Sequence, residues 1–483
     1  MRDRFLRWMR PAVFLGHNGV TLAGAVLTTS SAIILIGFWI VDLFQGRRIP
    51  PYAGIILFLV LPGIFVAGLA LMPAGVWMRR RSLAARGKLP DVYPKIDLRQ
   101  PVLRRALVLV VVLSGVNALL LGAATYRGVE YMDSTQFCGQ TCHTVMQPEF
   151  RAYQASPHAR VACVDCHIGS GAPWFVRAKI SGVRQVFAVT LKTYSRPIPS
   201  PVENLRPARE TCEQCHWPQK FGGEKLVVRT HFAEDEKNSR KVSVLLLKIG
   251  GRRANGSSGI HGHHIDARER IDYVSTDRRR QVIPVVRVTG TDGKTAEYAS
   301  SEVKATPEQL AAGEHRAMDC MDCHNRPTHI FQLPATAVDE AMAAGAISPD
   351  LPFVKKQAVA ALKKEYASRS VAAEEIARML TEFYRAQYPA TYQAHRALVE
   401  SAVESVQGIY ERNIFTAMKI GWGTYPNNIG HEDFLGCFRC HDGNHSTKDG
   451  RAITQDCDAC HTVLAQEEEN PKILTDLGIG GVK

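Results

Sequence analysis

A short pattern of two cysteines followed directly by a histidine recurs along the chain. We number the copies motifs 1 to 6 in chain order: Cys138, Cys142 and His143; Cys163, Cys166 and His167; Cys212, Cys215 and His216; Cys320, Cys323 and His324; Cys437, Cys440 and His441; Cys457, Cys460 and His461. Two thiols at this spacing can add to the two vinyl groups of a haem, while the adjacent imidazole binds the iron. The motifs use all 12 cysteines, so we expect six covalent c-type haems.

Two other kinds of site also use closely spaced cysteines. An even number of cysteines fits a disulfide framework, and Cys-x-x-Cys pairs also bind zinc. Neither explains a histidine after every second cysteine, because a residue next to a ligating cysteine is poorly placed to reach the same tetrahedral ion. The pattern therefore favours haem. Motif 1 has three residues between its cysteines instead of two, and we interpret it as a haem site with a longer loop.

Each low-spin haem iron needs a second axial ligand, for which His and Met are usual. The candidates are Met146, His158, His261, His263, His329, His431 and His445. His158 is too close in sequence to motif 2 to reach across that haem, so we expect it to serve another one. The cluster GIHGHH at 259–264 could supply one ligand, or be a polar or metal-binding loop. His395 is interpreted as a surface residue, and His231 and His315 are left open.

Three long apolar runs precede the motifs. They cover residues 20–44, 53–77 and 106–126, and each has the roughly twenty residues that an α-helix needs to cross a bilayer. The first run is too long for a signal peptide, begins late, and lacks a persuasive cleavage site. We therefore expect residues 1–126 to be a membrane anchor with three transmembrane helices.

The positive charges around these runs predict their orientation. Four arginines precede the first run, two lie in the first loop, and nine Lys and Arg residues lie in the second loop. Because basic loops stay in the cytoplasm, the N-terminus and second loop are predicted to be cytoplasmic and the haem region periplasmic. The periplasm of a bacterium is also where thiols are oxidised, which agrees with haem attachment on that side of the inner membrane.

The formal net charge of +13 does not indicate nucleic-acid binding. Residues 1–126 contain 15 Lys and Arg against 4 Asp and Glu, whereas the remainder contains 44 against 42. The propionates of six haems would outweigh this small surplus. A basic surface that could bind nucleic acid is therefore not expected in the haem region.

The haem region divides into three parts that differ in motif density and hydrophobic pattern. Residues 127–221 hold motifs 1 to 3. Residues 222–310 contain period-two stretches such as KVSVLLLKIGG, which predict a small β insertion. Residues 311–483 hold motifs 4 to 6 and a long stretch with helical spacing. The predicted fold is mainly α: transmembrane helices, then a multihaem region of helices and loops with a small β insertion.

The stretch from 103 to 221 resembles the NapC/NirT family of membrane-anchored multihaem c-type cytochromes. An apolar helix there leads into FCGQTCHTVM, then SPHARVACVDCH and ETCEQCHWPQKF. The two additional apolar runs and the residues after 221 resemble a larger branch with six haems and three spans. The family pattern has Met two residues after the His of motif 1, whereas here Met146 stands three after His143.

The resemblance implies a quinol dehydrogenase. Such proteins take electrons from menaquinol or ubiquinol in the membrane and pass them through their haems to a periplasmic reductase or cytochrome, in some cases toward extracellular acceptors. The link from Tyr126 to Cys138 spans at most about 18 Å if helical, so the first haem is expected near the membrane surface. Lys179 resembles a family lysine near the quinol site, although a lysine reaching from an amphipathic segment to the membrane interface is the alternative.

Two further functions remain open from the sequence. A reductase of nitrite, hydroxylamine or a sulfur oxyanion would need a haem with one free axial position, which the abundance of histidines disfavours. A purely structural relay subunit of a larger respiratory complex is the other. Whether the chain is itself an enzyme is therefore left open at this stage.

Overall fold

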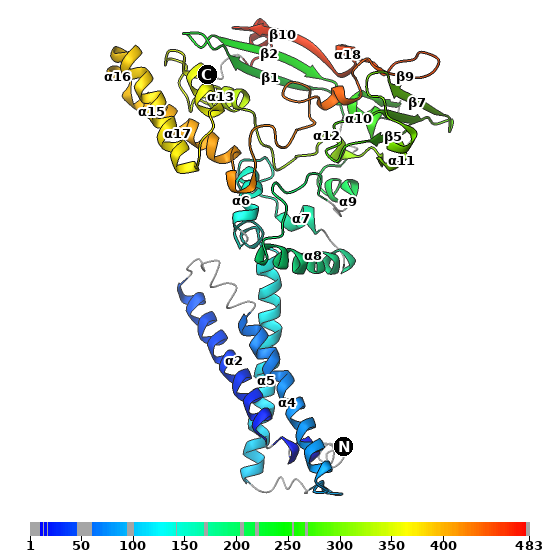
Figure 1. Cartoon of the computed structure of the whole chain (residues 1–483), viewed down its shortest axis with the longest axis vertical. Coiled ribbons are helices and arrows are strands. Elements are labelled where there is room, and N and C mark those ends of the chain that lie inside the picture. Colours follow the sequence, from blue (N-terminus) through cyan, green and yellow to red (C-terminus); the bar gives the residue numbers. More distant parts are fainter. Residues whose placement is uncertain are drawn as a thin grey trace. The chain divides into compact units, whose positions relative to one another are not determined.

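The chain folds into two units, Met1–Cys142 and His143–Lys483. The structure is a computed structural model (Figure 1) that describes residues 10–12, 14–16, 18–45, 60–93, 101–141, 143–168, 172–202, 207–217, 222–253, 256–265 and 269–479. The expected division into 1–126, 127–221, 222–310 and 311–483 was made by sequence texture. In the structure, contacts join the segments 222–310 and 311–483, together with residues 143–221, into the second unit. Residues 127–142 belong to the first unit.

Long helices build the first unit: α2 (Gly19–Gln45), α4 (Leu61–Ala85) and α5 (Pro101–Met132). Helices α2 and α4 pack closely through small residues. A Cβ atom added at Gly24 would lie 2.7 Å from the Gly68 carbonyl oxygen, so a larger side chain there would push the backbones apart. Close approach through glycines is how helices pack in a lipid environment, where burying apolar surface gains little.

The apolar helices agree with the predicted membrane anchor. Within the described residues, Gly19–Gly37 and Leu61–Ala85 are each long and apolar enough to cross a membrane. The first residues of the predicted run 53–77, up to 59, lie outside the described residues. The helix that contains the rest of the run continues to Ala85. The predicted run 106–126 lies within α5, several of whose side chains are also outside the described residues.

Short helices dominate the start of the second unit. The π-helix η2 (Phe137–Thr141) ends the first unit, and the second begins with α6 (His143–Gln154), α7 (Cys163–His167), α8 (Ala172–Thr190) and α9 (Ala208–Cys212). The side of α6 toward the rest of the unit packs Val145 and Ala152 against Phe415, Met418 and Ile420. This contact joins the beginning of the unit to a segment far along the chain.

Three small sheets follow. One has the strand order β1-β2-β10, with β1 (Lys225–Phe232), β2 (Arg240–Leu247) and β10 (His461–Glu468). The second pairs β3 (Gly251–Arg253) with β4 (Gly256–Ser258). The third has the order β8-β5-β6-β7-β9, with β5 (Arg270–Ser275), β6 (Val285–Thr289), β7 (Thr295–Ser300), β8 (Glu314–Ala317) and β9 (His445–Ser446).

Strands from the C-terminal part complete two of these sheets. β10 pairs antiparallel with β2, and β9 pairs antiparallel with β7, although more than a hundred residues separate the partners in sequence. Both carry or adjoin haem motifs, since β10 begins at His461 and β9 begins four residues after His441. The β insertion therefore positions motifs 5 and 6.

A helical layer without motifs forms the largest apolar core of the second unit. It consists of α13 (Pro334–Ala343), α14 (Val354–Lys363), α15 (Arg369–Gln387), α16 (Pro389–Ala394) and α17 (Arg396–Asn413). The side chains of Val338, Ile376 and Val406 are fully buried in it. Asp339 joins this layer to β1, since its carboxylate forms an ion pair with Lys355 at 2.5 Å and accepts the Phe232 N–H at 2.9 Å.

The remaining elements are short. They are α10 (Gly259–His264), α11 (Pro307–Ala312), α12 (Cys320–Cys323), α18 (Cys457–Cys460), α19 (Lys472–Asp476), and the 3₁₀ turns η4 (Thr416–Met418) and η5 (Gly436–Arg439). The predicted mainly helical fold with apolar N-terminal helices and small sheets is confirmed.

Candidate functional site

Each regular motif lies in or at the end of a single helical turn. Motifs 2, 4 and 6 form α7, α12 and α18, motif 3 begins at the last residue of α9, and η5 covers the start of motif 5. Residues three apart on a helix lie on the same side, so one turn directs both thiols of a motif the same way. In motifs 3, 4 and 5, the histidine N–H donates to the carbonyl of the first cysteine, at 2.8, 2.8 and 3.1 Å.

Every regular motif histidine faces a second imidazole. The five pairs, with the distances between their ring centres, are His167 and His329 at 6.2 Å, His216 and His158 at 6.0 Å, His324 and His261 at 6.3 Å, His441 and His264 at 5.7 Å, and His461 and His431 at 6.3 Å. The structure thus brings together four of the candidate histidines with four different motifs, and adds His264 as the fifth partner.

These distances fit an iron between the rings. A metal–imidazole bond is about 2 Å long, and two such bonds plus the distance from each nitrogen to its ring centre add up to roughly 6 Å. No disulfide joins any two cysteines within the part of the chain that the structure describes. The residues present therefore suit a covalently attached haem that is ligated by histidine on both faces.

Backbone carbonyls fix the orientation of four rings in these pairs. In each of these histidines, the Nδ1 atom lies within hydrogen-bonding distance of the backbone carbonyl oxygen of another residue. The pairs are His329 with Glu149 at 2.9 Å, His264 with Ile260 at 2.8 Å, His441 with Thr454 at 2.7 Å, and His158 with Pro327 at 3.2 Å. When Nδ1–H donates to a carbonyl, Nε2 carries the lone pair that binds a metal. The surroundings of these rings thus select the tautomer that an iron requires.

The surroundings of the paired rings also favour their neutral form. Burial is the main cause that lowers the pKa of six of them, His167, His329, His261, His264, His324 and His461. A protonated imidazole has no lone pair for a metal, so this environment suits ligation.

Comparisons with known proteins decide the family. The N-terminal region of the NapC/NirT cytochrome c family matches residues 100–198. The cytochrome c-type protein ImcH of Geobacter sulfurreducens is 42% identical over 457 residues, which are 94% of this chain and 89% of that protein. The chain belongs to the NapC/NirT cytochrome c family. Membership implies covalently bound haem c, and with the apolar helices it makes this NapC/NirT protein a membrane-anchored cytochrome of electron transfer.

A more distant relative matches a smaller part of this NapC/NirT cytochrome. The cytochrome c-type protein TorC of Escherichia coli K12 is 28% identical over 138 residues, which are 25% of this chain and 35% of TorC. No solved structure gives a significant match. The pairing of the histidines in this NapC/NirT cytochrome therefore comes from its own geometry.

Motif 1 lies where the two units meet in sequence. Cys138 is in η2, and its thiol lies 3.9 Å from the Met132 carbonyl oxygen. Cys142 and the His143 side chain are outside the described residues, while Met146 is half-buried in α6. Lys179 belongs to α8, and its side chain is likewise outside the described residues. The geometry of the first haem site and of a quinol site therefore stays a prediction.

The structure differs from the sequence-based candidates at His445 and His263. His445 is 1% exposed, and both of its ring nitrogens have other partners, Nδ1 with Asp442 Oδ1 at 2.9 Å and Nε2 with the Ile283 carbonyl at 2.8 Å. His263 is exposed, and within the described residues no second ring faces it. We therefore retain neither as a ligand. His264 takes its place, because it lies three residues after His261 and thus on the same side of α10.

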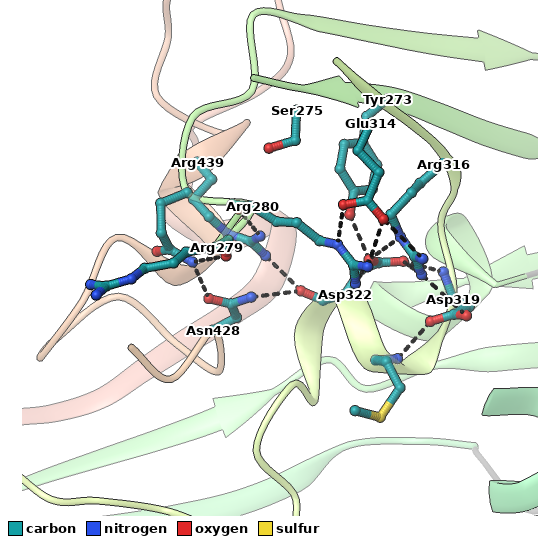
Figure 2. Close-up of polar contacts among 12 residues, drawn as sticks. Tyr273, Ser275, Arg279, Arg280, Glu314, Arg316, Asp319, Asp322, Asn428 and Arg439 are labelled. Carbon is teal, nitrogen blue, oxygen red and sulfur yellow. Dashed lines mark hydrogen bonds and ion pairs between the residues drawn. The ribbon is translucent and has the colours of Figure 1, made fainter. Parts of the chain in front are cut away.

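A network of buried charges connects motif 4 to its surroundings (Figure 2). Asp322, within motif 4, is 2% exposed, and its carboxylate accepts hydrogen bonds from Tyr273 at 2.5 Å and Arg316 at 3.0 Å. The Asp322 carbonyl accepts from Arg439 at 2.7 Å and from Asn428 at 3.0 Å. The sequence analysis did not identify Asp322 or its partners, because the spacing of the cysteines in a motif says nothing about the residues between them or about distant contacts. A buried carboxylate needs such partners, and they hold motif 4 in place.

Proposed function

We propose that this chain oxidises quinol at the membrane and passes the electrons through six haems to a periplasmic acceptor. When bound, haem iron takes up and releases one electron at a time by alternating between its ferric and ferrous forms. Quinol of the menaquinol or ubiquinol type supplies two electrons and releases two protons. The acceptor is a reductase or a soluble cytochrome, and a route toward extracellular acceptors is part of the proposal.

The proposed sites follow from the motifs and the ring pairs. The cysteines of motifs 1 to 6 attach the haems covalently, and the six motif histidines bind the irons on one face. His329, His158, His261, His264 and His431 bind the irons of motifs 2 to 6, in that order, on the other face. For motif 1 we propose Met146 as the second ligand.

The observation that carries the proposal is the second imidazole opposite every regular motif histidine. An iron with histidine on both faces has no open position for a substrate, so it transfers electrons and does not bind nitrite, hydroxylamine or a sulfur oxyanion. This favours electron transfer over a reductase at these five sites. The identity of 42% with a cytochrome c-type protein over most of the chain also supports it.

The proposed topology places the haem region in the periplasm of a bacterium. The basic second loop favours a cytoplasmic location for that loop and for the N-terminus. Helix α5 then ends on the periplasmic side at Met132, six residues before Cys138. This short link supports a first haem close to the membrane surface, where a quinol headgroup can reach it. Lys179 is the proposed polar contact of the quinol site.

The experiment compares quinol-driven reduction in the full chain and in three variants. In detergent, a menaquinol analogue should reduce the haems of the full chain, followed by the growth of the reduced α-band in stopped flow. Met146→Leu and Lys179→Ala should slow this reduction while the haem content, measured by mass spectrometry, stays complete. Arg184→Ala serves as the matched control for Lys179, because it removes a positive charge from the same helix α8.

Two results would count against the proposal. If the full chain stays oxidised with both menaquinol and ubiquinol analogues but is reduced by a soluble electron donor, the anchor is a tether and the chain is a relay subunit. If nitrite, hydroxylamine or a sulfur oxyanion oxidises the reduced protein with catalytic turnover, the reductase interpretation replaces it.

A further inference from the structure

Contacts in the fold join motif 3 to both motif 2 and motif 4. Helix α9, which leads into motif 3, contacts both α7 of motif 2 and α12 of motif 4. The Nδ1 atom of His158, the ring opposite motif 3, lies 3.2 Å from the carbonyl oxygen of Pro327, three residues after His324 of motif 4. Motif 3 therefore lies between motifs 2 and 4.

Motifs 4 and 5 are joined on two sides. On one side, α10 carries both facing rings, His261 for motif 4 and His264 for motif 5, within a single turn. On the other side, Arg439 lies between the cysteines of motif 5 and donates to the Asp322 carbonyl of motif 4 at 2.7 Å. The same guanidinium donates to the Arg280 carbonyl at 2.7 Å, as Figure 2 shows.

Motifs 5 and 6 are joined by the segment before motif 5. The Cys437 N–H donates to the Gly430 carbonyl at 2.9 Å, and the next residue is His431, the ring that faces motif 6. The Phe438 ring of motif 5 stacks on His431, with ring centres 4.3 Å apart and planes at 11°. The first residue of motif 5 and the second ligand of motif 6 are therefore parts of one short, closed loop.

We propose that the sites of motifs 2 to 6 form one row in chain order, and that the site of His431 and His461 is its end, from which electrons leave the protein. The inference rests on the proposed function for the direction of electron flow, whereas the order of the sites rests on the contacts alone. Each contact described above joins consecutive motifs. Arg439 is a positioning residue in this row, because it fixes motif 5 against motif 4 without contacting an iron.

The position of the last site in the second unit fits this assignment. Within the second unit, Figure 1 shows α7 and α9 close to α6, where the unit begins, and α18 with β10 on the opposite side. His431 is exposed, as are Cys437 and Cys457, but Cys166 of motif 2 and Cys215 of motif 3 are exposed too, so exposure permits access to the last site without singling it out. An acceptor of one-electron type, such as another haem protein, can therefore approach this site from solvent.

Electron balance requires a simple sequence of events. Each transfer oxidises one ferrous site and reduces the next ferric one, so no bond forms or breaks and no proton moves within the row. The two electrons of one quinol travel one after the other. Two reduction events of a one-electron acceptor at the last site therefore balance the oxidation of one quinol.

The first test uses the two ends of the row. His431→Met and His329→Met each replace an imidazole by a thioether, which retains the haem and raises its potential. We expect the ratio of electron delivery to quinol-driven reduction to fall at least about tenfold in His431→Met, corresponding to a rise of about 59 mV at a one-electron site. In His329→Met the altered site precedes the other four, so both rates should fall and the ratio should stay near that of the wild type.

The readouts separate the row from the proposed function. A soluble monohaem cytochrome c is the probe acceptor, a redox titration monitors the shifted potential, and His263→Met, in the same helix as two ligands, is the control that should shift no potential. Equal ratios in the two end variants would overturn the assignment of the last site. Iron positions from an experimental structure of the haem-loaded protein test the order without quinol, and a motif 6 iron between two others would overturn the row.

Discussion

Replacing Arg439 tests how strongly motif 5 is held against motif 4. Its guanidinium is 9% exposed and donates to three carbonyls, those of Gly436 at 2.8 Å, Arg280 at 2.7 Å and Asp322 at 2.7 Å. In Arg439→Met, the Asp322 carbonyl keeps Asn428 as a donor, whereas the Gly436 and Arg280 carbonyls lose the guanidinium as a donor. A buried carbonyl that loses its donor costs about 1–3 kcal/mol. Since methionine restores part of the packing, we expect a loss of about 2–4 kcal/mol in the free energy of unfolding.

Chemical denaturation of the haem-loaded protein measures this loss, and the midpoints give the difference between variants. Arg279→Met is the matched control, because Arg279 lies in the same turn as Arg280 but is exposed, so the change should stay within about 0.5 kcal/mol. Arg439→Lys should also lose most of the stabilisation that Arg439 provides, since one ammonium cannot reach three divergent carbonyls. Equal midpoints for Arg439→Met and Arg279→Met would refute the reasoning.

Three further outcomes are expected. Denaturing mass spectrometry should show six haem additions, and five would mean that motif 1 carries none. His261→Met and His264→Met should each change the electron paramagnetic resonance signal of one low-spin haem, whereas His263→Met should change none; a change in the control would reassign the ligands of α10. Asp339→Asn should destabilise the protein by about 3–5 kcal/mol because Lys355, whose side chain is 3% exposed, would stay buried without a carboxylate, and thermal unfolding of the loaded protein checks this.

The motifs and the anchor could be predicted from sequence because their signals are local. A Cys-x-x-Cys-His copy occupies five consecutive residues, and an apolar run is visible without any knowledge of the fold. The partner of each motif histidine is a different kind of information. His329 faces His167 across 162 positions in sequence, and only the folded loops determine that pairing.

Proximity in sequence was a misleading guide at His445. It lies four residues after His441, yet β9 turns its ring into the core toward Asp442 and Ile283. His264 had a usable signal, the spacing of three residues from His261 that places both on one side of a helical turn. The β insertion was recognisable by its alternating pattern, but its completion by β9 and β10 was not, because strand pairing between distant segments leaves no local trace.

The pairing of rings from distant segments has a consequence for how the protein matures. In the proposed topology, motif 2 would be exported before motifs 3 and 4, and its proposed second ligand, His329, would follow only after them. A haem attached to motif 2 at that moment would have one axial position open to water or small gases. If haem is attached during export, the early haems would be attached before their final ligation, and export of the segment that follows motif 4 would complete the ligation of the second haem.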